Sequence, residues 1–276
     1  MNTEVTGAGG VRIALRVAGP EDARPIVFVH GWAQSAAAWS RQFADPALAE
    51  NFRLVAMDLR GHGCSDVPAD GYDDPEQWAG DLAAVLDFAG PDAILVGWSY
   101  GGLVIADYLR VHGTARLGGI VLVGAITEIG RKREGGKTGP VMRAALPAAL
   151  AEDAETAIPA LVEFTRAQAS EKVPGGYAQA MLGSSLSVPP SVRGALFRRE
   201  IGSEDVLAAI DKPTLVVHGS ADGVVDPCAA EFSAGKIPGA VLRWFVGAGH
   251  LPFVEEPEEF GSVLRRFAGN TADQQE

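Results

Sequence analysis

The chain has 276 residues, of which 47% are hydrophobic and 21% are charged, a composition that suits one globular domain with a full core. Its formal net charge of -12 and its pI near 4.9 argue against nucleic acid or a membrane surface as a partner, because no basic cluster offsets the acidic excess. The two cysteines, Cys64 and Cys228, form neither a disulfide framework nor a metal-ligand pattern. Residues 1–6 lack a signal-peptide pattern and no apolar run is long enough to span a membrane, so we expect a soluble cytoplasmic protein.

Short apolar runs alternate with amphipathic segments along the chain, which is typical of an α/β protein with a mostly parallel sheet and helices on both faces. Residues 11–17 alternate in polarity and predict an antiparallel edge hairpin that turns at residues 7–10. Continuous apolar runs, which predict strands covered on both faces, follow at residues 25–29, 52–57, 93–96, 119–123, 213–217 and 241–246. We therefore expect a mostly parallel eight-stranded sheet.

Two crossover helices are marked clearly in the sequence. Residues 75–89 follow a capping aspartate, Asp73 or Asp74, and Gly90 is the expected stop. Residues 257–268 repeat apolar side chains at helical spacing, and the polar tail from Asn270 to Glu276 is expected to be frayed.

One connection is far longer than the others, with roughly eighty residues between the strand near 125 and the strand near 213. Much of it has helical periodicity, and six prolines are expected to divide it into short helices. These are Pro140, Pro147, Pro159, Pro174, Pro189 and Pro190. We expect residues 126–208 to be a helical cap, inserted over the carboxyl edge of a core formed by residues 1–125 and 209–276.

The pentapeptide Gly97-Trp98-Ser99-Tyr100-Gly101 lies between a predicted buried strand and a predicted helix. Strand, G-x-S-x-G and helix in this order are typical of a nucleophile elbow, in which a strained turn raises one serine above the sheet. A β-carbon at either flanking glycine would collide with the neighbouring strand and helix. Ser99 is therefore the candidate nucleophile.

A serine nucleophile needs a base, and the best candidate is His250 in the glycine-rich loop after the last strand. That loop opens on the carboxyl edge of the sheet, where Ser99 also lies. The competing histidines are His30, His62, His112 and His218, for which strand-end, turn and helix-end positions favour structural roles.

The base needs an acid that orients it, and this acid is expected after a strand between Ser99 and His250 in chain order. Asp222 fits, because it follows the strand that ends in His218-Gly219. Asp226 precedes Pro227 and fits better as a helix N-cap, and Glu128 is a third choice.

Acyl transfer also needs donors for the developing oxyanion. One candidate is the backbone N–H of Tyr100 at the start of the helix after the nucleophile, and the other is the backbone N–H of Trp32 in the loop after the strand at 25–29. The Trp32 indole is also a candidate wall of the acyl pocket.

In these candidate nucleophile, base, acid and oxyanion residues, the chain resembles α/β-hydrolase fold enzymes of the lidded serine carboxylesterase type. The resemblance rests on five segments and covers nearly all of the chain outside the cap. They are His30-Gly31-Trp32, residues 58–66, residues 97–102, His218-Gly219-Ser220-Ala221-Asp222 and Gly249-His250-Leu251-Pro252.

The resemblance implies a small-molecule ester substrate of short or medium size and a two-step mechanism through an acyl-enzyme, with no metal and no cofactor. Ser99 argues against epoxide hydrolases and haloalkane dehalogenases, which place aspartate at the elbow. Cofactor-free perhydrolases or haloperoxidases, lactonases and carbon–carbon bond hydrolases keep the serine triad and remain alternatives. A hydrolase-fold small-molecule receptor is an alternative from another class, and the oligomeric state stays open.

Overall fold

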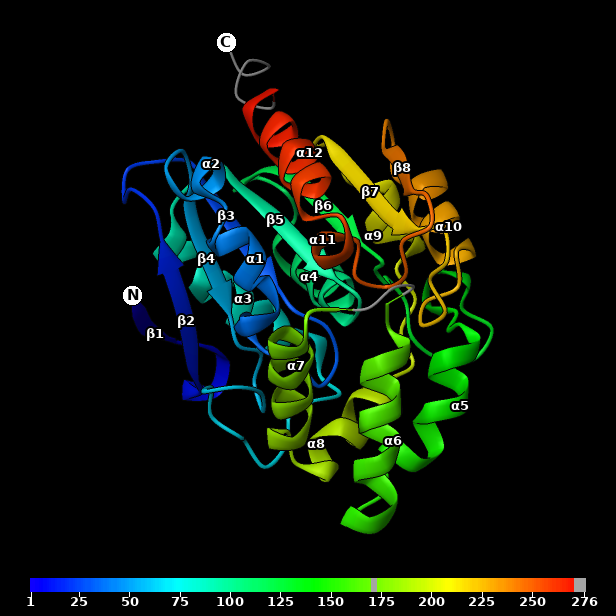
Figure 1. Ribbon diagram of the computed structural model, residues 1–276. Coiled ribbons are helices and arrows are strands. Elements are labelled where there is room, and N and C mark those ends of the chain that lie inside the picture. Colours follow the sequence, from blue (N-terminus) through cyan, green and yellow to red (C-terminus); the bar gives the residue numbers. More distant parts are fainter. Residues whose placement is uncertain (170–172, 271–276) are drawn as a thin grey trace.

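The chain is built around one eight-stranded sheet in the computed structural model, which describes residues 1–169 and 173–270 (Figure 1). The strands are β1 (Asn2–Thr6), β2 (Arg12–Ala18), β3 (Pro25–Val29), β4 (Arg53–Met57), β5 (Ala93–Trp98), β6 (Leu117–Val123), β7 (Thr214–Gly219) and β8 (Val241–Phe245). Their order across the sheet is β1-β2-β4-β3-β5-β6-β7-β8. The β1–β2 hairpin and the β2–β4 pair are antiparallel, and all later pairs are parallel. The predicted fold class is confirmed.

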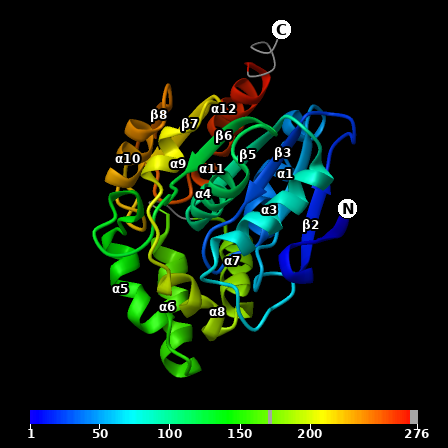
Figure 2. The same cartoon turned by 180° about the vertical axis from the view of Figure 1, so that it is seen from behind.

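Helices cover both faces of the sheet (Figures 1 and 2). The helices of the core are α1 (Ser40–Phe43), α2 (Pro46–Ala49), α3 (Pro75–Ala89), α4 (Tyr100–His112), α10 (Cys228–Lys236), α11 (Pro252–Glu255) and α12 (Pro257–Asn270). Alternate residues of β3 point into different cores: Val27 joins the cluster with α3 and α4, and Phe28 joins the cluster with α1 and α12. The central strands are therefore largely apolar because both of their faces are buried.

The helix predicted at residues 75–89 is confirmed at both ends as α3. The Asp74 carboxylate accepts the Glu76 N–H at 2.9 Å, and Gly90 ends the helix with a φ of 108°. The C-terminal helix α12 reaches Asn270, and the rest of the polar tail lies outside the described residues.

The prediction that residues 241–246 are covered on both faces was wrong. β8 alternates between exposed and partly buried positions up to the buried Phe245, and Val241 is 60% exposed. The reason is its place at the edge of the sheet, where β8 pairs only with β7. Hydrophobicity alone did not distinguish this edge strand from a central one.

Five helices lie between β6 and β7 in the sequence, and the first four of them lie together at one end of the sheet, whereas the fifth packs against α4 and α10 (Figures 1 and 2). They are α5 (Pro140–Ala149), α6 (Ala154–Ala167), α7 (Gly175–Ser187), α8 (Pro190–Ala195) and α9 (Glu204–Ala208), with a 3-10 turn, η4 (Leu196–Arg198), after α8. Contacts such as the hydrogen bond from Gln34 Nε2 to Ser185 Oγ at 2.9 Å place α7 against the loop that follows β3. The group α5 to α8 therefore lies at the carboxyl end of the strands.

Two of the six prolines do not interrupt their helices, contrary to the prediction. Pro147 lies inside α5 and Pro159 lies inside α6. Both side chains are exposed, so the carbonyls that lose a helical donor, those of Arg143 and Glu155, lie on the solvent side. Water can hydrogen-bond to these carbonyls, which lowers the cost of the missing N–H.

Candidate active site

The turn between β5 and α4 forces Ser99 into a strained backbone conformation, with φ 55° and ψ -120°. A β-carbon at Gly97 would lie 2.9 Å from the backbone carbonyl carbon of Gly101 on α4, and one at Gly101 would lie 2.4 Å from the Val29 carbonyl oxygen on β3. Both contacts are shorter than real side chains allow, so the expected steric need for the two glycines is confirmed. The turn has the geometry of a nucleophile elbow.

His250 and Asp222 are brought together at the ends of β8 and β7. The His250 ring hydrogen-bonds through Nδ1 to Asp222 Oδ2 at 2.7 Å. The other carboxylate oxygen, Oδ1, accepts the backbone N–H groups of Val224 and Val225 at 2.8 and 3.0 Å. The carboxylate is thus fixed in one orientation, and its bond to Nδ1 directs Nε2 of the imidazole away from it.

The backbone of His250 is held by two further hydrogen bonds. Trp98 donates its indole N–H to the His250 carbonyl at 3.0 Å, and the two rings lie 5.4 Å apart. The His250 N–H donates to the carbonyl of Gln168 at 2.7 Å. Trp98 directly precedes Ser99, so these contacts place the imidazole beside the elbow. No local sequence signal points to Gln168, whereas Trp98 lies inside the G-x-S-x-G motif.

The loop after β3 lies against the nucleophile. A β-carbon at Gly31 would lie 2.9 Å from Ser99 Cβ, so only glycine lets this loop approach so closely. Within residues 1–169 and 173–270, the Ser99 hydroxyl and the backbone amides of Trp32 and Tyr100 have no hydrogen-bond partner in the protein. A hydroxyl and two amide donors are therefore available to a bound ligand.

The Trp32 side chain reaches away from the sheet toward the inserted helices. Its indole N–H donates to the Arg193 carbonyl at 3.1 Å. Phe164 and Phe197 pack edge-on against it, with ring centroids 5.7 and 5.5 Å away. The aromatic cluster joins the loop after β3 to α6 and η4 above the site.

The two alternative acids are engaged elsewhere. Asp226 accepts the Cys228 N–H at the start of α10 and pairs with Lys137 at 3.3 Å, in agreement with a capping role. Glu128 is buried and accepts the backbone N–H groups of Gly135 and Ser203. Neither is placed against the His250 ring.

The competing histidines make structural contacts. His30 accepts the Leu59 N–H through Nε2, and burial lowers its pKa to about 4. Burial also lowers the pKa of His62, to about 3. His218 hydrogen-bonds through Nε2 to the Val225 carbonyl and lies 3.4 Å from Asp222 Oδ2, and burial lowers its pKa. His112 packs against Tyr108 at the end of α4.

Gly124 is a site residue that the sequence analysis missed. Its φ is +48°, and a β-carbon there would lie 3.1 Å from His250 Nδ1 and 3.2 Å from Asp222 Oδ2. Its place at the end of β6, between the strands that carry Ser99 and Asp222, was the available signal.

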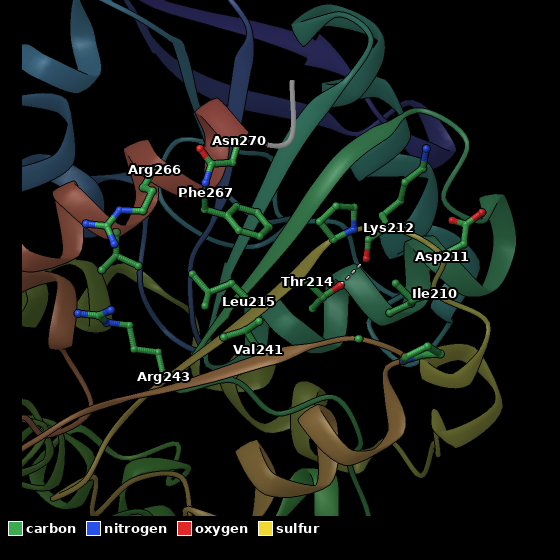
Figure 3. Close-up of a pocket in the computed structure, with 14 residues that line it drawn as sticks. Ile210, Asp211, Lys212, Thr214, Leu215, Val241, Arg243, Arg266, Phe267 and Asn270 are labelled. Atoms are coloured by element: carbon green, nitrogen blue, oxygen red, sulfur yellow. Dashed lines mark hydrogen bonds between the residues drawn. The ribbon is translucent and has the colours of Figure 1, made fainter. Parts of the chain in front are cut away.

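A cavity of about 690 Å³ lies between β7, β8 and α12, where Leu215 and Phe267 form an apolar floor between Lys212, Arg243 and Arg266 (Figure 3). It borders Thr214 at the start of β7, whereas Asp222 follows the other end of that strand. The cavity is therefore not the pocket of the Ser99 site. In the described part of the chain, no group of three or more metal-ligating side chains is gathered, and no helix is long and apolar enough to cross a membrane.

Comparison with known proteins identifies the family. The model of the alpha/beta hydrolase family matches residues 26–263. An esterase from a Rhodococcus species has a similar structure, with a TM-score of 0.91 and 47% identity over 97% of this chain and 98% of that one. A non-heme chloroperoxidase from Streptomyces lividans is 32% identical over 95% of this chain and 98% of its own length. A bifunctional esterase/perhydrolase from Acinetobacter calcoaceticus is 31% identical over 80% of this chain and 82% of its own.

The chain belongs to the alpha/beta hydrolase family. The resemblance drawn from its motifs is confirmed, and the family includes esterases of closely similar structure.

Proposed function

We propose that Ser99, His250 and Asp222 are a catalytic triad that cleaves small carboxylic esters. The enzyme class, a carboxylic ester hydrolase, is that of its esterase relatives. The observation that carries the assignment of residues is the 2.7 Å bond between His250 and Asp222 beside a serine at φ 55°. A nucleophile next to a base that an acid orients is the arrangement that acyl transfer requires.

In the first step, Ser99 Oγ attacks the ester carbonyl while His250 Nε2 takes its proton. Asp222 keeps the other ring proton on Nδ1 and stabilises the imidazolium that forms. The carbonyl oxygen becomes an oxyanion, and the amides of Trp32 and Tyr100 are proposed to hold it. The tetrahedral intermediate then breaks its bond to the alcohol oxygen, which leaves with the proton from His250.

In the second step, water attacks the acyl-enzyme as His250 takes one of its protons. The same amides stabilise the second oxyanion. The bond from the acyl carbon to Ser99 Oγ breaks, the serine recovers its proton from His250, and the carboxylic acid leaves.

We propose that residues 126–208 form the cap of this site over a core of residues 1–125 and 209–276. Support comes from the contacts of Trp32 with Phe164, Phe197 and the Arg193 carbonyl, which join the proposed oxyanion loop to these helices. Ser99 is 7% exposed and His250 is 1% exposed, so little room is open to water. An apolar, nearly closed site favours esters with short or medium acyl groups.

Perhydrolysis is a second candidate function, favoured by the haloperoxidase and esterase/perhydrolase relatives. Hydrogen peroxide in place of water would attack the same acyl-enzyme, giving a peracid and the free serine. The test is peracid formation from a short carboxylic acid and hydrogen peroxide by the wild type and by Ser99→Ala.

Labelling with a fluorophosphonate tests the triad. We expect one phosphonyl group per chain, located by mass spectrometry on the peptide that contains Ser99, with parallel loss of esterase activity. Labelling of another serine, or inactivation without a label on Ser99, would contradict the assignment.

A further inference from the structure

The buried side chain of Tyr100 connects α4, the helix that begins directly after Ser99, to the segment inserted between β6 and β7. Its hydroxyl donates to the Leu196 carbonyl at 3.3 Å and accepts a hydrogen bond from Arg199 Nη1 at 3.1 Å. Leu196 begins η4, and Arg199 follows its end. Tyr100, whose backbone amide faces the substrate in the proposed mechanism, is thus held through its side chain by residues 196–199, which lead from the inserted helices back to the sheet.

Arg199 is itself fixed by a buried ion pair. Its Nη2 lies 2.8 Å from Asp107 Oδ1 and 2.7 Å from Asp107 Oδ2, and both side chains are almost fully inaccessible to water. Asp107 lies on α4, two turns after Tyr100 and on the same side of the helix. The guanidinium therefore joins two points on the nucleophile helix.

Stability alone does not account for this ion pair. Removing two charges from water costs free energy that their attraction recovers only in part, and apolar replacements of similar size are often as stable. In addition, the buried Nε of Arg199 has no hydrogen-bond partner, which adds a further cost of desolvation. A buried pair that costs this much is suited to fixing a geometry rather than to adding stability.

We propose that Arg199 is a positioning residue for ester cleavage, because its bonds to the Tyr100 hydroxyl and to Asp107 fix the start of α4 and hence the Tyr100 amide that faces the oxyanion. The proposal rests on the proposed function of Ser99 and Tyr100. It extends that function to a residue from the inserted segment that does not touch the substrate.

Two variants break the link in different ways. Tyr100→Phe keeps the ring and the ion pair and removes the hydroxyl, whereas the double variant Arg199→Met/Asp107→Leu removes both charges together and leaves no charge buried alone. For each we expect kcat on p-nitrophenyl butyrate to fall about 10- to 100-fold, the range expected for a misplaced catalytic group. KM is expected to change less than about threefold, because ground-state binding does not use the oxyanion donors.

A boronic acid inhibitor supplies a readout that a purely structural role would not move. It forms a tetrahedral adduct with the serine and so reports the oxyanion site directly. Its inhibition constant is expected to rise by the same factor as kcat falls. The pH profile of kcat/KM is expected to keep its shape, since His250 and Asp222 are untouched.

The chain offers a matched control in a second buried ion pair, Arg60 with Asp81. Arg60 Nε lies 2.7 Å from Asp81 Oδ2, both side chains are 1% exposed, and neither contacts Ser99 or Tyr100. Arg60 and Asp81 also hydrogen-bond the Ala8 carbonyl and N–H, so Arg60→Met/Asp81→Leu leaves these two backbone groups without their partners and is expected to lower the unfolding temperature. It is expected to leave kcat of the folded protein within about twofold of the wild type.

Unchanged kcat and unchanged boronic acid affinity in a folded Tyr100→Phe variant would overturn the proposal. So would an equal loss of kcat in the two ion-pair variants, since it would reflect general destabilisation. If Arg199→Met/Asp107→Leu does not fold, Tyr100→Phe decides alone. Failure of the triad assignment is recognised separately, because Ser99→Ala would then retain esterase activity.

Discussion

His250 Nδ1 and Asp222 Oδ2 lie 2.7 Å apart, although 28 residues separate the two in the sequence. Asp222 follows β7 and His250 follows β8, and these strands are parallel neighbours. Their carboxyl ends meet at one edge of the sheet, where β5 also delivers Ser99. The sheet topology therefore gathers three residues that the sequence keeps far apart.

Asp222→Asn tests the acid directly. The amide cannot hold the imidazole in the required tautomer, so kcat is expected to fall about 10³- to 10⁴-fold with little change in KM. Asp226→Asn is the matched control, since Asp226 pairs with Lys137 and caps α10 four residues away. Its kcat is expected to stay within about threefold of wild type, and kinetics of both on p-nitrophenyl acetate provide the measurement. A larger loss of kcat in Asp226→Asn than in Asp222→Asn would show that Asp226, and not Asp222, orients the base.

Gly124→Ala tests the packing beside the acid–base pair. The added methyl group would lie 3.1 Å from His250 Nδ1 and 3.2 Å from Asp222 Oδ2, so we expect kcat to fall at least about 10-fold. Gly239→Ala is the control, because Gly239 also has a positive φ (69°) but no atom within 4 Å of the added carbon. Both variants are expected to lose about 1 kcal/mol of stability from backbone strain, and only the first to lose activity. Similar kcat values for the two would contradict this role for Gly124.

Trp98→Phe tests whether the hydrogen bond from the Trp98 indole to the His250 carbonyl helps to position the proposed base. The variant keeps an aromatic ring beside His250 and removes the indole N–H that bonds the His250 carbonyl at 3.0 Å. A loss of about one hydrogen bond to the catalytic loop is expected to lower kcat about 3- to 10-fold. Trp39→Phe removes an indole N–H that has no partner, and its kcat is expected to stay unchanged. Steady-state kinetics give kcat for both variants. A Trp98→Phe variant with the kcat of the wild type would refute the role of this hydrogen bond.

Stability is expected to fall in mild acid because of two buried histidines. Burial lowers the pKa of His30 to about 4 and of His62 to about 3, so the folded state stays neutral where the unfolded state, with a pKa of about 6.5, takes up protons. The contribution of each histidine is thus complete above about pH 6.5 and is lost as the pH falls toward its folded pKa.

His62→Gln isolates one of these contributions. The free energy of unfolding of the wild type, relative to this variant, is expected to decrease by on the order of 2 kcal/mol between pH 7 and pH 5. Urea denaturation at the two pH values measures it. A difference that does not depend on pH would show that His62 titrates alike in both states.

The sequence predicted those features that depend on local pattern. The order of strand, G-x-S-x-G and helix predicted the strained turn at Ser99 between β5 and α4, and a capping aspartate with a terminal glycine gave both ends of α3. Residues whose roles depend on distant neighbours were missed, namely Gly124 beside the acid–base pair and Gln168, whose carbonyl accepts the His250 N–H. No sequence signal near Gln168 records its contact, and the one signal for Gly124 was its place at the end of β6.

The errors have the same origin. Proline was expected to end the helices at Pro147 and Pro159, but both lie on exposed faces where the loss of one helical bond is tolerated. Apolar residues at 241–246 indicated a central strand, but β8 lies at the sheet edge. In each case the environment of the residue, rather than its type, decided the outcome.

The most direct test of the triad is the hydrolysis of p-nitrophenyl esters, from acetate to palmitate, by the wild type and by Ser99→Ala. We expect turnover of the short esters to be highest in the wild type and to fall by at least about 10⁴-fold in Ser99→Ala, with the fold unchanged by circular dichroism. Activity that survives in a folded Ser99→Ala variant would contradict the mechanism.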